Sequence, residues 1–146
     1  MANDTIDALN SFLRGEISAA ETYRQAIEKL NDKPEASTLT ECLRSHEQRA
    51  SLLTREIVRL GGEPAEGSGT WGAFAKLVEG GAKLFGAKAA IAALEEGEDH
   101  GRDDYKKDAP KLAPDARAFV QTQLVPEQLR THQLMSTLKK RLDTAA

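Results

Sequence analysis

The sequence predicts an all-α protein, a bundle of four long helices, and three observations lead to that prediction. Apolar residues recur at alternating steps of three and four positions through four long stretches of chain, which is the period of an amphipathic helix. Only 5% of the 146 residues are aromatic, and runs of β-branched residues are scarce, so strands are disfavoured. Glycine and proline, which interrupt helices, gather between these stretches.

The first two helices form a predicted hairpin over residues 4–60. We expect the first helix over residues 4–30 and the second from residue 34 or 39 to residue 60. The expected core stripe of the first is Ile6, Leu9, Leu13, Glu16, Ala20, Tyr23, Ile27 and Leu30. The expected core stripe of the second is Leu39, Leu43, His46, Ala50, Leu53, Ile57 and Leu60. Because a handful of residues joins them, the two helices should be antiparallel neighbours.

The last two helices form a second predicted hairpin over residues 87–143. We expect the third helix over residues 87–108 and the fourth over residues 114–142, joined between Pro110 and Pro114. The expected core stripe of the third is Ile91, Leu94, Glu98, Gly101 and Tyr105. That of the fourth is Val125, Leu129, His132 and Ser136. Together the four helices make residues 1–146 a single domain.

The segment between the hairpins, residues 61–86, is a predicted crossover and holds eight of the eleven glycines. It is long enough to run the length of a bundle, so the second and third helices can be parallel. One long crossover is the connectivity of ferritin-like bundles. Within it we expect a short amphipathic helix over residues 71–85, packed over the bundle or against a second subunit.

Both hairpins carry the same polar motifs. The pattern G-E-x6-Y occurs in the first and third helices, and E-x-L-R-[ST]-H occurs in the second and fourth. The residues that match are Glu16 with Glu98, Tyr23 with Tyr105, and His46 with His132. The order is the same in both halves, which indicates an internal repeat of a helical hairpin.

The repeat predicts a site in the core. A glutamate or histidine within an apolar stripe has a desolvation cost and needs a partner. A pseudo-twofold axis between the hairpins would bring Glu16, His46, Glu98 and His132 to one level. There they could form Glu–His hydrogen bonds or share a cation, and two carboxylates with two imidazoles suit Fe(II), Mn(II) or Zn(II).

Three further side chains could support the four candidate ligands. Tyr23 and Tyr105 lie two turns from their glutamates on the same stripe, so each could donate a hydrogen bond to a carboxylate of the other half. Glu47, beside His46, could reach into the site. We therefore take these three as candidates for the surroundings of a metal.

On these motifs the sequence resembles the ferritin-like superfamily, and rubrerythrin in particular. It looks closest to a group of uncharacterised bacterial ferritin-like bundle proteins, on the stretches ALEEGED and LGGEP. The resemblance implies iron binding, ferroxidase or peroxide-type activity, and a role in iron or oxidative-stress handling. Di-iron members carry Glu-x-x-His on the second and fourth helices. Here Leu43 and Leu129 stand three positions before the histidines, so both bridging carboxylates are missing.

Because the bridging carboxylates are missing, the candidate site has several possible interpretations. It could hold a single metal ion, iron or else zinc or manganese, or a dinuclear centre completed by solvent or nearby carboxylates. It could also be a layer of Glu–His pairs with no metal, which sets the register of the helices. In that case the protein is a non-enzymatic structural or interaction bundle.

Composition limits the partners and the location that we expect. The formal net charge is −3 with no basic tract, which argues against nucleic acid. No apolar run approaches the ~20 residues that cross a bilayer. The single cysteine and an N-terminus without a secretion signal favour the cytoplasm. We expect a metal ion as ligand and a homo-oligomer, a dimer, as the assembly.

Overall fold

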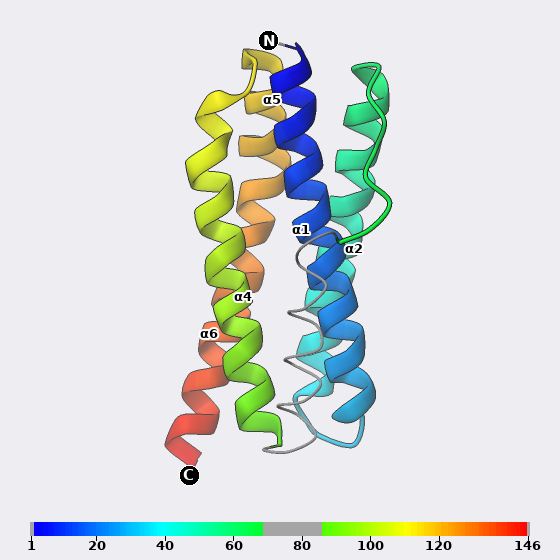
Figure 1. The fold of residues 1–146 in the computed structure, drawn as a ribbon. Coiled ribbons are helices and arrows are strands. Elements are labelled where there is room, and N and C mark those ends of the chain that lie inside the picture. Colours follow the sequence, from blue (N-terminus) through cyan, green and yellow to red (C-terminus); the bar gives the residue numbers. More distant parts are fainter. Residues whose placement is uncertain (1, 69–85, 146) are drawn as a thin grey trace.

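Four long helices build the computed structural model, which describes residues 2–68 and 86–145 (Figure 1). They are α1 (Ala2–Lys29), α2 (Ala36–Arg59), α4 (Ala87–Asp108) and α6 (Val125–Ala145). The described residues contain no strand. The predicted fold class, an all-α four-helix bundle, is confirmed. The short helix expected over residues 71–85 lies outside the described residues.

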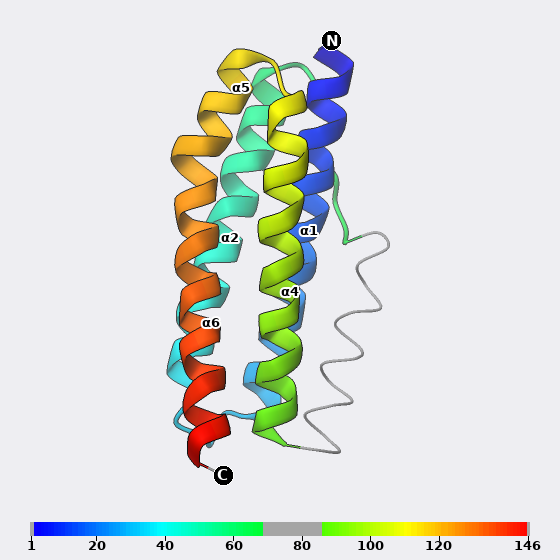
Figure 2. The same ribbon diagram turned by 90° about the vertical axis from the view of Figure 1, so that its left-hand side faces the viewer.

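The helices pair as two hairpins. α1 packs most extensively on α2, and α4 on α6, while α1 against α4 and α2 against α6 close the bundle more sparsely. α2 and α4 run in the same direction, and α1 and α6 run opposite to them (Figures 1 and 2). This is the parallel arrangement that the long crossover predicts.

The end of α2 depends on two glycines. Gly61 has φ +83°, a conformation that glycine adopts without strain, and its N–H bonds to Val58 O at 2.9 Å. Gly62 N–H bonds to Ile57 O at 2.9 Å. The pair of bonds satisfies carbonyls that the end of a helix leaves unpaired. Two glycines after a helical stripe are the sequence signal of such an end.

The fourth predicted helix is one continuous helical run with an irregular turn. α5 (Pro114–Phe119) leads into η3 (Val120–Leu124), a π-helical turn, and then into α6. Pro126 is the second residue of α6, directly after η3, and it has no N–H to donate back towards Thr122, so the regular ladder is broken there. A π-turn holds more residues than an α-turn and therefore changes the face that later residues present.

The change of face moves the core stripe of α6 by one position from the one that we expected. The buried residues are Leu124, Gln128, Thr131, Met135 and Leu138. Leu129, expected in the core, is 51% exposed, and His132 is only partly buried. The prediction was wrong because it assumed a straight α-helix. Buried positions from Ala116 to Gln128 recur every four residues, and a regular helix would turn roughly 40° off the core at each step.

The apolar core is divided into two clusters. One, towards the α1–α2 turn, includes Leu30, Leu39, Ile91 and Met135, and the other, towards the opposite end, includes Leu9, Leu13, Leu53 and Leu124. Tyr23 belongs to the first cluster and Tyr105 to the second. Between the two clusters lies a layer of buried polar side chains, which contains the candidate site.

Candidate functional site

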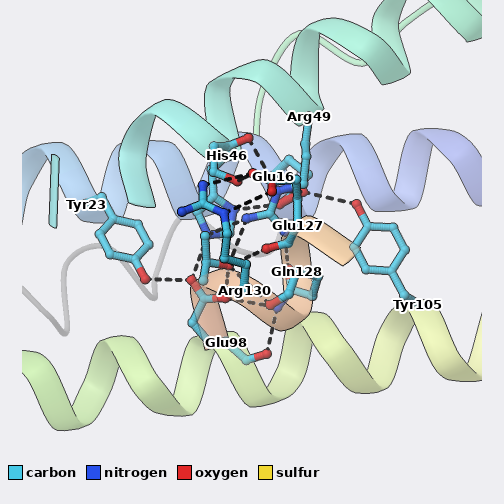
Figure 3. Close-up of polar contacts among 11 residues, drawn as sticks. Glu16, Tyr23, His46, Arg49, Glu98, Tyr105, Glu127, Gln128 and Arg130 are labelled. Carbon is cyan, nitrogen blue, oxygen red and sulfur yellow. Dashed lines mark hydrogen bonds and ion pairs between the residues drawn. The ribbon is translucent and has the colours of Figure 1, made fainter. Parts of the chain in front are cut away.

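Three of the four predicted ligands meet in the polar layer. Glu16 comes from α1, His46 from α2 and Glu98 from α4, and each is at most 4% exposed (Figure 3). Each lies on the stripe that its helix turns towards the core, which is why the sequence pattern found all three.

His46 joins the two glutamates. Its Nδ1 lies 2.7 Å from Oε1 of Glu16, and its Nε2 lies 2.7 Å from Oε2 of Glu98. Ionised carboxylates only accept hydrogen bonds, so both ring nitrogens must donate, and the ring is an imidazolium. Burial lowers the pKa of His46, but the Glu98 carboxylate raises it, and the net pKa lies above its ordinary value. The pKa of Glu98 falls to about 2, because its attraction to His46 and Arg49 outweighs the effect of burial.

The tyrosines cross between the hairpins as the sequence predicted. Tyr23 of α1 donates to Oε2 of Glu98 at 2.6 Å, and Tyr105 of α4 donates to Oε2 of Glu16 at 3.0 Å. They stand at opposite ends of the layer (Figure 3). Burial first, and then the neighbouring carboxylate, raises the pKa of each phenol well above its ordinary value. Both therefore stay protonated hydrogen-bond donors.

Arg49, which the sequence pattern did not single out, is completely buried in the layer. Its Nε lies 3.2 Å from Oε2 of Glu16, and its Nη2 donates to Oγ1 of Thr131 at 3.0 Å. Its Nη1 donates to Oε1 of Gln128. Its spacing makes it a candidate, since Arg49 follows His46 by three positions and lies beside it on α2, but an arginine at such a position can also extend to solvent.

α6 contributes two neutral side chains that were also missed. Gln128 donates through Nε2 to Oε1 of Glu98 at 3.0 Å and to its backbone oxygen at 2.9 Å. Thr131 donates to the same Oε1 at 2.8 Å. These residues occupy the core face because of the π-turn before α6. Their positions could not be read from a helical period alone.

All four carboxylate oxygens of the layer are therefore occupied by donors. Those of Glu16 accept from His46 and Tyr105 and form an ion pair with Arg49, and those of Glu98 accept from His46, Tyr23, Gln128 and Thr131. The two negative charges meet two positive ones, the His46 imidazolium and the Arg49 guanidinium. A buried network that is both saturated and neutral avoids the large cost of an unpaired buried charge.

The fourth predicted ligand, His132, lies outside the layer. Its side chain is 18% exposed, and its Nε2 contacts Oδ1 of Asp99 and lies 3.3 Å from Nη1 of Arg102. Glu47, expected to support the site, is exposed and pairs with Arg24 at 2.9 Å. The structure thus brings Glu16, His46 and Glu98 together but not His132 or Glu47.

The repeat itself is present in three dimensions, with a different pairing on α2 and α6. Residues of the two halves correspond at a separation of 82 positions: Glu16 with Glu98, Tyr23 with Tyr105, His46 with Gln128, and Arg49 with Thr131. The match of His46 with His132 depends on a separation four positions longer, and His132 lies one turn beyond Gln128, roughly 40° further round α6, where it is only partly buried. The true repeat is symmetric in its glutamates and tyrosines and asymmetric in its cations, both of which come from α2.

A small cavity adjoins the layer between α1 and α4. It measures about 50 Å³, room for a few water molecules, and Glu16, His46 and Glu98 contribute to its wall. Small residues surround it, among them Gly15, Ala19, Gly97 and Gly101. They reduce the packing between α1 and α4 beside the carboxylates.

The layer does not fit a metal centre as it is arranged. A histidine ligand must offer a nitrogen lone pair, and both ring nitrogens of His46 carry protons that carboxylates accept. The guanidinium of Arg49 supplies positive charge at the same carboxylates. Over residues 2–68 and 86–145 no group of three His, Cys, Asp or Glu side chains has an arrangement that could hold a metal ion.

The fold and the layer define an all-α four-helix bundle built from two related hairpins around a buried, charge-balanced polar layer. The chain belongs to the family described as Domain of unknown function (DUF2383), whose model matches residues 4–109. That range includes Glu16, Tyr23, His46, Arg49, Glu98 and Tyr105. No curated protein and no solved structure matches the chain. None of the described helices combines the length and apolar character that crossing a membrane requires.

Proposed function

We propose that the protein is a ferritin-like bundle that works without a metal, as a non-enzymatic structural or interaction protein. The observation that supports this is Arg49: a buried guanidinium beside Glu16 supplies the positive charge that a metal would otherwise provide. Its ferritin-like ancestry is supported by the paired glutamates and tyrosines and by the parallel arrangement of α2 and α4.

The layer then has a structural task. Its hydrogen bonds connect all four helices, so a slip of one helix would leave buried charges without partners. Such a penalty favours one register over the alternatives. The activity of the protein lies, on this proposal, in the surface that the rigid bundle presents, as a homodimer in the cytoplasm.

The competing function is metal binding, with iron first and zinc or manganese as alternatives, and with ferroxidase or peroxide chemistry. Metal loading separates the two. Protein prepared without a His-tag is incubated with Fe(II), Zn(II) or Mn(II), freed of excess metal and measured by elemental analysis and thermal unfolding. We expect no stoichiometric metal and no rise in melting temperature, because only a ligand that binds the native state stabilises it.

The control is Glu16→Gln, which removes one carboxylate of the layer. One metal per chain in the natural protein, lost in Glu16→Gln, would overturn the proposal in favour of metal binding. Fe(II) oxidation in air, followed against a protein-free reaction, adds an independent readout, and we expect the two rates to be equal.

A further inference from the structure

The layer combines side chains of the types that bind metal ions with a cationic side chain of its own, that of Arg49. Glu16, Glu98 and His46 are side chains of the types that bind Fe(II), Mn(II) or Zn(II). Arg49 reaches the same atoms: its Nε lies 3.2 Å from Oε2 of Glu16, and its Nη2 lies 3.1 Å from Nε2 of His46. The guanidinium therefore lies where a bound cation would contact both groups.

We infer that Arg49 is the built-in cation of this layer and excludes metal, so that removing its side chain turns the layer into a divalent-metal site. The inference rests on the proposed function, since it takes the natural layer to be metal-free. It assigns the ligands as Glu16, Glu98 and His46, and the class of ligand as a divalent transition-metal ion.

Charge supports the inference. With Arg49 the layer has two carboxylates against two cationic side chains. Without Arg49 the carboxylates of Glu16 and Glu98 would face the single positive charge of His46 in a water-poor core, and an uncompensated buried charge is strongly unfavourable. A divalent ion would replace one proton of His46, which is released to solvent, so that two carboxylates, a neutral imidazole and the ion sum to zero charge. Carboxylate and imidazole are ligand types that such ions take.

The volume that truncation of Arg49 would free also supports the inference. The guanidinium and its three-carbon stem are completely buried, so truncation leaves a void at the carboxylates. The void would adjoin the cavity of about 50 Å³ between α1 and α4, whose wall includes Glu16, His46 and Glu98. The carboxylates and imidazole in its wall, together with its size, permit water molecules, which can complete the coordination of an ion held by few protein ligands.

The test is a titration with Co(II), whose visible absorption reports coordination by protein ligands, in the natural protein, Arg49→Ala and Arg49→Gln. Arg55→Ala, an exposed arginine on the same helix, is the matched control, and Arg49→Ala with His46→Ala removes the imidazole ligand. We expect Arg49→Ala to bind one Co(II) per chain about 100-fold or more tightly than the natural protein. Arg55→Ala and the double variant should behave like the natural protein.

Circular dichroism with and without Co(II) covers the case in which Arg49→Ala does not fold alone. Metal that restores its helical signal supports the inference, because metal binding is then coupled to folding. Failure of Co(II) to bind or to restore helix in both Arg49 variants, while the natural protein is also metal-free, overturns this inference and leaves the proposed function standing. Stoichiometric Co(II) in the natural protein overturns the proposed function itself.

Discussion

Nη2 of Arg49 lies 3.1 Å from Nε2 of His46, so two cationic side chains of one helix meet in the centre of the bundle. The repulsion between these two positive charges is offset by two carboxylates, because Glu16 contacts both of them and Glu98 bonds His46 from α4. The four charges form one unit. Removing any one leaves the others unbalanced within a buried layer, and several measurable consequences follow.

The first prediction concerns Arg49 and stability. Arg49→Ala should lower the free energy of unfolding by about 3–5 kcal/mol, because it leaves two buried carboxylates with a single cation, His46. Arg49→Lys should lose less, since it keeps the charge but not the planar donor fork. Denaturant unfolding without metal measures both. The exposed Arg55→Ala should change stability by no more than about 0.5 kcal/mol. An equal effect at Arg49 and Arg55 would contradict a buried role.

The second prediction uses the fact that Tyr23 and Tyr105 are the only two tyrosines in the chain. Because burial and a neighbouring carboxylate raise both pKa values, tyrosinate absorbance should not appear as the pH rises until the helices unfold. Parallel absorbance and circular dichroism titrations check this. Tyr23→Phe should halve the final absorbance change. A tyrosinate signal with a midpoint near the ordinary pKa of ~10, in protein that is still helical, would contradict the burial of the tyrosines and their hydrogen bonds in the layer.

The third prediction is that stability falls on both sides of mildly acidic pH. The pKa of Glu98 is lowered to about 2, so its contribution is present above the ordinary value of ~4.3 and is lost as the pH falls towards 2. The raised pKa of His46 acts in the opposite sense: its contribution is full below ~6.5 and is lost as the pH rises through the higher folded-state value. Melting temperatures between pH 2 and pH 10 measure both limbs.

The control for the pH profile is Glu98→Gln, which cannot change charge. It should flatten the acid limb, where the Glu98 shift accounts for about 3 kcal/mol. An acid limb that is unchanged in Glu98→Gln would mean that other carboxylates determine the acid stability.

The fourth prediction tests the register of α6. Leu124→Ala should cost about 2–5 kcal/mol, because Leu124 is completely buried in the core. Leu129→Ala should cost little, since Leu129 is 51% exposed. Unfolding of the two variants under one set of conditions compares them directly. The reverse order would restore the straight-helix register and, with it, an inward-facing His132.

The sequence determined most of the fold by itself. Stripes at steps of three and four residues place α1, α2 and α4, and the glycines at 61 and 62 mark where α2 ends. Glu16, His46, Glu98 and both tyrosines could be found because a polar residue within an apolar stripe needs a partner there.

The tertiary structure alone decided which side chains complete the layer. The π-turn before α6 rotates Gln128 and Thr131 inwards and His132 outwards, and a period calculated for a straight helix does not contain that turn. Arg49 turns inwards because Glu16, on another helix, offers a carboxylate at that level. An arginine beside an apolar stripe can equally extend to solvent, and only the charge that faces it across the bundle determines which it does.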